Sequence, residues 1–168
     1  MNAQQIRREL RNDPSVELRR RRAIIGLSLV GMAAMAPVCL LQTGLVRHLP
    51  DLPVRGVDSD GANLSDTAYR LGIPDGTLAL ASLAANIPVA AWGGAERARE
   101  QPWLSLGAAA KAVGDAVGAG SYFWQMLTGR EPWCPYCITA ALAIFGIAGL
   151  TLAEAATAIP ALPPAKRQ

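Results

Sequence analysis

The sequence predicts an all-α protein, a membrane four-helix bundle with a structured outer loop between its first and second helices. Hydrophobic residues make up 51% of the 168 residues and charged residues only 17%, whereas a soluble domain carries about 25% charged residues. The charges are also segregated, since residues 23–46 and 132–153 contain none. Uncharged apolar stretches of this length are typical of membrane spans, because placing a charge in hydrocarbon is costly.

The first 22 residues form a basic segment, which we expect on the cytoplasmic side. A basic segment beside an apolar run is typical of chains that hold one end against anionic lipid headgroups, and this composition argues against a nucleic-acid partner. The apolar run that follows, 23–42, is longer than the hydrophobic region of a typical signal peptide and lacks a small-x-small cleavage site. We therefore interpret it as a retained anchor. The arginines of the basic segment are Arg7, Arg8, Arg11 and Arg19 to Arg22.

Residues 23–156 form one predicted membrane domain with four helical segments. Pro37 is expected to bend the outer part of the first segment. The third segment is the least apolar, because Lys111 and Asp115 interrupt it. Its small residues predict close packing against neighbouring helices; they are Gly107, Gly114, Gly118 and Gly120. The four predicted spans are 23–42, 75–92, 103–127 and 134–156.

The segment between the first two spans, 43–74, is too long for a simple turn. It is rich in aspartate and in turn-forming proline and glycine, so we expect a structured cap outside the membrane. With the N-terminus inside, eleven lysines and arginines lie on the cytoplasmic side and four lie outside. This is a positive-inside bias. We expect a multi-pass protein of the bacterial cytoplasmic (inner) membrane, with both termini, including the tail 157–168, in the cytoplasm.

The motif Cys134-Pro135-Tyr136-Cys137 is the strongest local signal for chemistry. Two thiols three positions apart fit a disulfide within one helical turn, and the unpaired N–H groups and dipole of a helix N-terminus stabilise a thiolate. Pro135 suits the first turn, where its missing N–H costs nothing. We interpret the pair as redox-active on the oxidising outer side. The alternatives are two inert buried cysteines or part of a metal site. A metal site usually needs about four ligands, so we predict none.

Three further polar positions within the predicted spans have two interpretations each. Cys39 lies about one turn from the outer end of the first helix and is either a small packed hydrophobe or a relay thiol for the pair. Lys111 and Asp115, spaced i,i+4, share a helix face. They form a polar element in a proton path, or Lys111 extends to the inner interface with Asp115 beside it. Asn86, midway along the second span, must find a hydrogen-bond partner in the bundle or on a ligand.

The chain resembles the vitamin K epoxide reductase family and its bacterial homologues, over roughly residues 24–156. The residues that carry the resemblance are Leu71 to Pro74 before a short apolar helix, Tyr122 to Gln125 ending the third, and Trp133 to Cys137 opening the fourth. The resemblance implies a four-helix bundle that holds a lipid quinone, ubiquinone or menaquinone, as electron acceptor. It also implies that Cys134 faces redox partners, with a thioredoxin-like thiol protein on the outer side, and that Cys137 faces the quinone.

Asn86, Trp133 and Tyr136 are the predicted cofactor-binding residues. Trp133 and Tyr136 are either interfacial anchors or part of the wall of a quinone pocket beside the redox pair. Catalysis is assigned to Cys134 and Cys137, with Cys39 as a third candidate.

Two positions depart from the family pattern. Residues 43–74 contain no cysteine, where family members usually carry a second pair that shuttles electrons. Ala141 stands where many have tyrosine. The main hypothesis is a membrane thiol–quinone oxidoreductase that passes electrons from a thiol partner through the CxxC disulfide to a lipid quinone. The alternative, which the missing loop cysteines motivate, is a catalytically degenerate member that acts as a membrane scaffold or redox sensor.

Overall fold

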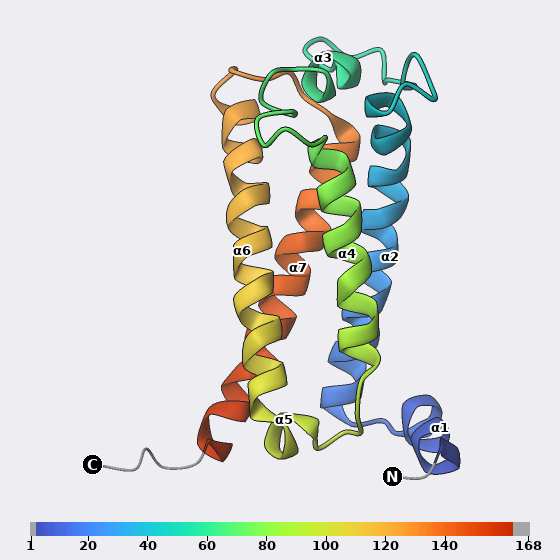
Figure 1. Ribbon diagram of the computed structural model, residues 1–168, viewed down its shortest axis with the longest axis vertical. Coiled ribbons are helices and arrows are strands. Elements are labelled where there is room, and N and C mark those ends of the chain that lie inside the picture. The colour runs from blue at the N-terminus through green and yellow to red at the C-terminus, as the bar shows by residue number, and fades with distance from the viewer. Residues whose placement is uncertain (1–2, 163–168) are drawn as a thin grey trace, which may run out of the picture.

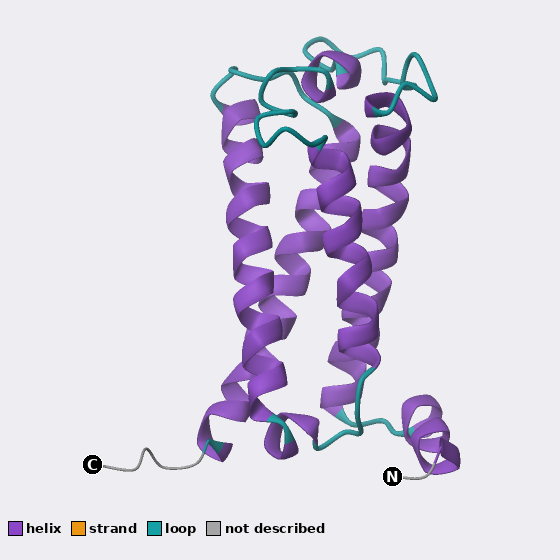
Figure 2. Ribbon diagram, in the orientation of Figure 1, coloured by secondary structure: helices purple, strands orange, loops and turns teal. Residues whose placement is uncertain are grey.

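The computed structural model describes residues 3–162, and every regular element in this range is helical, as predicted (Figures 1 and 2). The predicted tail falls partly outside this range, because residues 163–168 are not described. A single isolated bridge joins Val57 to Trp133. The elements are α1 (Ala3–Asn12), α2 (Val16–Gln42), α3 (Ser59–Asn63), α4 (Asp75–Ala91), α5 (Arg97–Glu100), α6 (Pro102–Leu127), α7 (Pro135–Ala158) and the 3-10 turn η1 (Ile159–Ala161).

The four long helices run side by side, with α3 at one end and α1, α5 and η1 at the other (Figure 1). Helix α2 packs extensively against α4 and α7, and α6 packs against α7, whereas the backbones of α4 and α6 approach each other at few positions. The bundle is therefore most loosely packed between α4 and α6, which long side chains join. The core between the helices consists of side chains such as Ile24, Met35, Val38, Leu83, Ala112, Ala140 and Ile147.

Glycines allow close helix contacts in α2 and α7, but three of the four glycines predicted to do so in α6 do not. A Cβ added at Gly31 of α2 would lie 2.9 Å from Leu83 of α4, and one at Gly146 of α7 would lie 2.9 Å from Leu27. By contrast, three of the four α6 glycines singled out in the sequence have no neighbour within 4 Å of such an atom: Gly107, Gly114 and Gly118. The prediction of close packing is wrong for these three, because Gly114 and Gly118 face the open space of a cavity between the helices and Gly107 is exposed.

Within the described residues, two helical stretches are long and apolar enough to cross a membrane, Val16–Gln42 and Pro135–Ala161. Helix α4 is shorter, at 17 residues, and spans about 25 Å. Helix α6 has 26 residues but carries Lys111 and Asp115. The start of α2 differs from the predicted span, since the Ser15 hydroxyl accepts a hydrogen bond from the Leu18 N–H. The helix therefore begins within the basic segment.

At the end opposite α3, a buried ion pair joins α5 to α7. Arg97 donates to both carboxylate oxygens of Glu154 at 2.8 and 2.9 Å, and their side chains are only 2% and 4% exposed. Ser105 of α6 also donates to Glu154. Arg21 of α2, 2% exposed, donates to the backbone carbonyls that follow α4, those of Trp92 and of residues 93–94. All four long helices are thus tied together at this end.

At the other end, residues 43–74 fold into an ordered cap around α3, which is the structured loop that the sequence predicts. Asp51 accepts hydrogen bonds from the N–H and hydroxyl of Ser59. Asp60 accepts from the Leu49 N–H at 2.9 Å and lies 2.8 Å from His48 Nδ1. Burial raises the pKa of Asp60, but these hydrogen bonds outweigh it, and the pKa is lower than usual. The cap is therefore held by its own carboxylates.

Candidate active site

Cys134 and Cys137 lie where α7 begins, directly beneath the cap. Their sulfurs are at disulfide-bonding distance and their Cα atoms are 5.3 Å apart. Cys134 is the N-cap residue of α7, its sulfur accepts a hydrogen bond from the Cys137 N–H at 3.2 Å, and Pro135 occupies the first turn. Cys134 is 0% exposed, whereas Cys137 is partly exposed. The two sulfurs therefore have different surroundings although they belong to one helical turn.

Asn63, at the end of α3, contacts both cysteines and was not singled out in the sequence. Its Nδ2 donates to the Cys134 sulfur at 3.2 Å and to the Ser59 carbonyl at 2.7 Å. Its Oδ1 lies 3.4 Å from the Cys137 sulfur. The side chain is 3% exposed. Asp58 starts this short helix by accepting from the Gly61 N–H, so an Asp-initiated turn in a loop is the only sequence signal that precedes it.

Gln42 connects the cap to the first turn of α4 and so fixes the position of Asn63 relative to that helix. Its Nε2 donates to the Asn63 carbonyl at 3.0 Å and to Asp75 Oδ1 at 2.6 Å. Its Oε1 accepts from the Gly76 N–H at 3.0 Å. A Cβ at Gly76 would lie 2.6 Å from that oxygen, so only glycine lets the amide approach. We refer to these contacts as the Gln42 latch.

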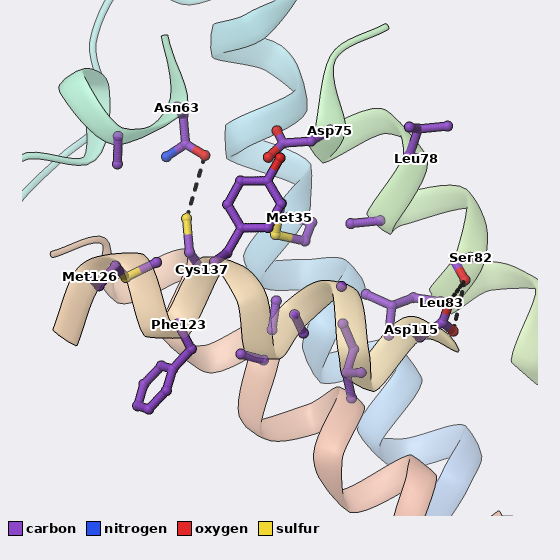
Figure 3. A pocket seen from close by; sticks show the side chains of 18 of the residues that line it. Met35, Asn63, Asp75, Leu78, Ser82, Leu83, Asp115, Phe123, Met126 and Cys137 are labelled. Atoms are coloured by element: carbon purple, nitrogen blue, oxygen red, sulfur yellow. Dashed lines mark hydrogen bonds between the residues drawn. The ribbon is translucent and has the colours of Figure 1, made fainter. Parts of the chain in front are cut away.

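Cys137 opens on a cavity of about 480 Å³ between α2, α3, α4, α6 and α7 (Figure 3). This volume falls in the range of small-molecule sites, about 300–1,000 Å³. The polar lining residues gather at two ends. Asn63, Asp75 and Cys137 lie at the cap end, and Ser82 and Asp115 lie at the other (Figure 3). The wall between them is apolar and consists of side chains such as Met35, Leu78, Ala79, Leu83, Ala119, Ala140 and Ile144.

Lys111 lies at the second end and extends across to α4, not toward the inner end of the bundle. Its ammonium donates to Asp115 Oδ2 at 2.7 Å, to Asn86 Oδ1 at 2.9 Å, and to the hydroxyl and carbonyl of Ser82 at 2.8 and 2.9 Å. The hydroxyl of Ser82 also lies 2.8 and 2.9 Å from the Asp115 carboxylate oxygens, to which it donates. Asn86, predicted to need a partner, therefore finds it in Lys111.

The three predicted cofactor-binding residues are not among those that line the cavity. Asn86 accepts a hydrogen bond from Lys111 and does not reach the cavity. Trp133 packs edge-on against Phe123, with ring centroids 6.5 Å apart, and its backbone pairs with Gly56 and Asp58 of the cap. Tyr136 donates its hydroxyl to the Pro50 carbonyl at 2.7 Å. Both aromatic residues thus attach the start of α7 to the cap, and Tyr136 also lines a second hollow of about 360 Å³.

Cys39 is a free, half-buried thiol on α2. Its backbone carbonyl accepts from the N–H and hydroxyl of Thr43 in the last turn of that helix. It does not line the cavity that contains Cys137. The described residues also contain no group of three or more His, Cys, Asp or Glu that could hold a metal ion.

Comparison with known proteins gives one result that covers most of the chain. The model of the vitamin K epoxide reductase family matches residues 22–152, a range that includes α4, α6, the cap, the cysteine pair and most of α2 and α7. No curated protein and no solved structure gave a significant match. Because the matched range exceeds half of the sequence, the chain belongs to the vitamin K epoxide reductase family, a family of integral membrane thiol–quinone oxidoreductases.

Proposed function

We propose that this protein passes electrons from a thiol partner, through the Cys134–Cys137 disulfide, to a lipid quinone in the cavity. The observation that carries the proposal is the position of the disulfide. One sulfur lies beneath the cap, and the other opens on a largely apolar cavity of about 480 Å³. A ring-shaped apolar acceptor with polar oxygens suits such a cavity.

The chemistry consists of two exchanges at the same pair. A partner dithiol attacks the disulfide through a mixed disulfide and leaves as a disulfide, so that Cys134 and Cys137 gain two electrons and two protons. The reduced pair then closes again, and a quinone gains the two electrons and two protons to become a hydroquinone. Cys134 is proposed to receive the partner and Cys137 to serve the quinone. Neither ubiquinone nor menaquinone is favoured by the lining residues.

The burial of Cys134 requires an explanation of how a partner reaches it. The cap contributes no cysteine of its own, and Asn63 covers the Cys134 sulfur. Cys39 is our candidate for a relay thiol, since it is the remaining cysteine and lies in the part of α2 next to the cap. A Cys39→Ser variant should then reduce quinone more slowly with a thioredoxin-like protein donor and at the wild-type rate with dithiothreitol. Equal rates with the protein donor would leave Cys39 as a packing residue.

We also propose that all four long helices cross a bacterial cytoplasmic membrane, with the cap outside and both termini inside. The excess of lysine and arginine on the predicted cytoplasmic side, eleven to four, supports this orientation. Helix α4 is short for a span, but the ordered cap above it and the loop at residues 92–96 extend the bundle. Asn86, Trp133 and Tyr136 are proposed to act on the quinone indirectly, by supporting Lys111 and the start of α7.

The direct test is a spectrophotometric assay of purified protein with dithiothreitol and a short-chain ubiquinone. Quinone reduction should depend on the protein, and Cys137→Ser should abolish it. Cys134→Ser should also lose turnover with a protein donor, because the cysteine that receives the partner is missing. Wild-type turnover in both single variants would disprove the proposal.

One observation favours the alternative, a degenerate member that acts as a membrane scaffold or redox sensor. Cys134 is 0% exposed, and the loop that would shuttle electrons to it has no cysteine. A sensor would change its cysteine state with the surrounding redox potential but would give no catalytic quinone reduction. The same assay separates the two functions.

A further inference from the structure

The polar end of the cavity farthest from the cysteines has no part in thiol exchange. Ser82 of α4 and Asp115 of α6 line the cavity there, and Lys111 binds both. Ionisable side chains inside membrane helices are costly and usually mark a functional path. This pair remains partly accessible, with side chains of Lys111 and Asp115 that are 32% and 22% exposed. Packing alone does not explain why a lysine and an aspartate stand beside an otherwise apolar cavity.

The polar lining residues at the two ends of the cavity have the same sequence spacing on two helices. On α4 the lining residues Asp75 and Ser82 are seven positions apart, and on α6 the same holds for Asp115 and Tyr122. Seven residues of helix correspond to about 10.5 Å. The cavity therefore separates its polar ends by close to two helical turns.

A para-quinone fits that separation with one oxygen at each end. Two C=O bonds of about 1.23 Å across a six-membered ring place the oxygens about 5 Å apart, and a hydrogen bond of about 2.8 Å at each side brings the span to about 11 Å. When one oxygen faces Cys137, the other faces Ser82. The thiol protons cannot reach this distal oxygen directly, because the ring lies between them.

We propose that Ser82 and Lys111 form a proton relay to the distal oxygen of the quinone, with Asp115 as the residue that positions both. This inference rests on the proposed function. Ser82 lines the cavity, and its hydroxyl accepts from Lys111 at 2.8 Å and donates to Asp115. Its single proton turns from Asp115 to the quinone oxygen when a quinone is bound. Asp115 fixes the relay, since it accepts from the ammonium and from the hydroxyl.

Cys134 and Cys137 form their S–S bond and release two electrons and two protons, and the quinone takes up two electrons. The proximal oxygen takes one proton at the cysteine end. The distal oxygen takes the Ser82 hydroxyl proton, Ser82 recovers a proton from the Lys111 ammonium, and Lys111 recovers one from water, which carries away the second thiol proton. No other oxidant or reductant is required.

The test is single-turnover quinone reduction by the prereduced full-length protein, with ubiquinone-1 as the probe. Ser82→Ala should slow this step about 10-fold or more, since a positioned proton donor contributes about 10²- to 10⁴-fold. The KM for ubiquinone-1 should change little, and Ser82→Thr, which keeps the hydroxyl, should restore most of the rate. The matched control is Ser121→Ala, because Ser121 lies on α6, is exposed, and donates only to its own helix at Gly118.

Two further measurements separate a proton donor from a packing residue. The loss of rate in Ser82→Ala should be smaller with a chlorinated benzoquinone. Its reduced oxygen is less basic, so its reduction depends less on a proton donor. The double variant Lys111→Met/Asp115→Leu removes both charges together, which avoids an unpaired buried charge, and should show the same dependence on the acceptor. The thiol–disulfide equilibrium of each variant with glutathione should match that of the wild type.

The outcomes are distinct. A Ser82→Ala protein that reduces ubiquinone-1 as fast as Ser121→Ala would overturn the relay, and so would an equal loss with every acceptor. A wild-type protein that exchanges thiols but reduces no quinone would instead refute the proposed function.

Discussion

Asn63 donates a hydrogen bond from its side-chain amide to the sulfur of Cys134, 71 positions later in the chain, at 3.2 Å. The same amide presents its oxygen to the sulfur of Cys137 at 3.4 Å. An amide oriented in this way interacts best with a reduced pair. Its N–H groups favour a thiolate at Cys134, and its oxygen accepts a proton from a thiol at Cys137.

Removing the Asn63 amide should make the pair harder to reduce. We expect Asn63→Ala to shift the Cys134–Cys137 potential by about 30 mV to more negative values. This corresponds to about 1.4 kcal/mol, within the net contribution of about 0.5–1.5 kcal/mol that one hydrogen bond makes. Equilibration with glutathione, followed by alkylation and mass determination, measures this shift. Asn86→Ala is the matched control, because Asn86 contacts Lys111 and not the cysteines. An unchanged potential would mean that the amide serves only to hold the cap.

Opening the Gln42 latch should expose Cys134. In Gly76→Ala the new Cβ would lie 2.6 Å from the Gln42 Oε1, so the amide must move and release the Asn63 carbonyl. We expect the prereduced protein to be alkylated at Cys134 several-fold faster than the wild type, as read by peptide mass. Gly107→Ala is the control, since nothing lies within 4 Å of that position. Equal alkylation in both variants would argue against the latch.

The ion pair between Arg97 and Glu154 should contribute strongly to stability. Glu154→Gln leaves the Arg97 charge buried without its counter-ion, which typically costs about 3–5 kcal/mol. Unfolding in detergent, followed by circular dichroism, should report a loss of this size. Glu96→Gln is the matched substitution, because Glu96 and Arg99 pair with side chains 63% and 74% exposed, and exposed pairs contribute about 1 kcal/mol or less. Similar losses in both variants would contradict the assignment.

Labelling in intact cells should place the cap outside and α5 inside. In a background with all three native cysteines replaced by serine, Arg55→Cys in the cap should react with a membrane-impermeant maleimide. Glu100→Cys at the end of α5 should react only after the cells are opened. Both positions are exposed, so lack of reaction reports sidedness and not burial. Labelling at Glu100→Cys but not at Arg55→Cys in intact cells would reverse the orientation.

The order and extent of the long helices could be predicted from the sequence because apolar composition and helix-ending residues are local signals. Three of the four predicted segments, 75–92, 103–127 and 134–156, agree with α4, α6 and α7 to within two residues. The start of α2 was placed too late. The predicted boundary at 22 follows charge, which indicates where hydrocarbon begins, whereas the helix itself begins at the Ser15 cap.

The contacts of the site could not be predicted in the same way, because they join residues far apart in the chain. The CxxC motif identifies Cys134 and Cys137, but nothing near Asn63 in sequence indicates that a five-residue helix would hold it above them. Similarly, the i,i+4 spacing of Lys111 and Asp115 predicts their pairing, which the structure confirms. It gives no indication that Ser82 and Asn86 of another helix would complete the cluster.

The partners of Arg21 and Arg97 at the end opposite the cap also bear on biosynthesis. Arg21 is made some seventy residues before the carbonyls that it binds, and Arg97 is made 57 residues before Glu154. A nascent chain that has not yet completed α7 therefore carries an arginine without its counter-ion. Helix α7 supplies that carboxylate at one end and the two cysteines at the other. The chain thus acquires its redox centre and the carboxylate that binds Arg97 from the same helix, so a product truncated before α7 would lack both.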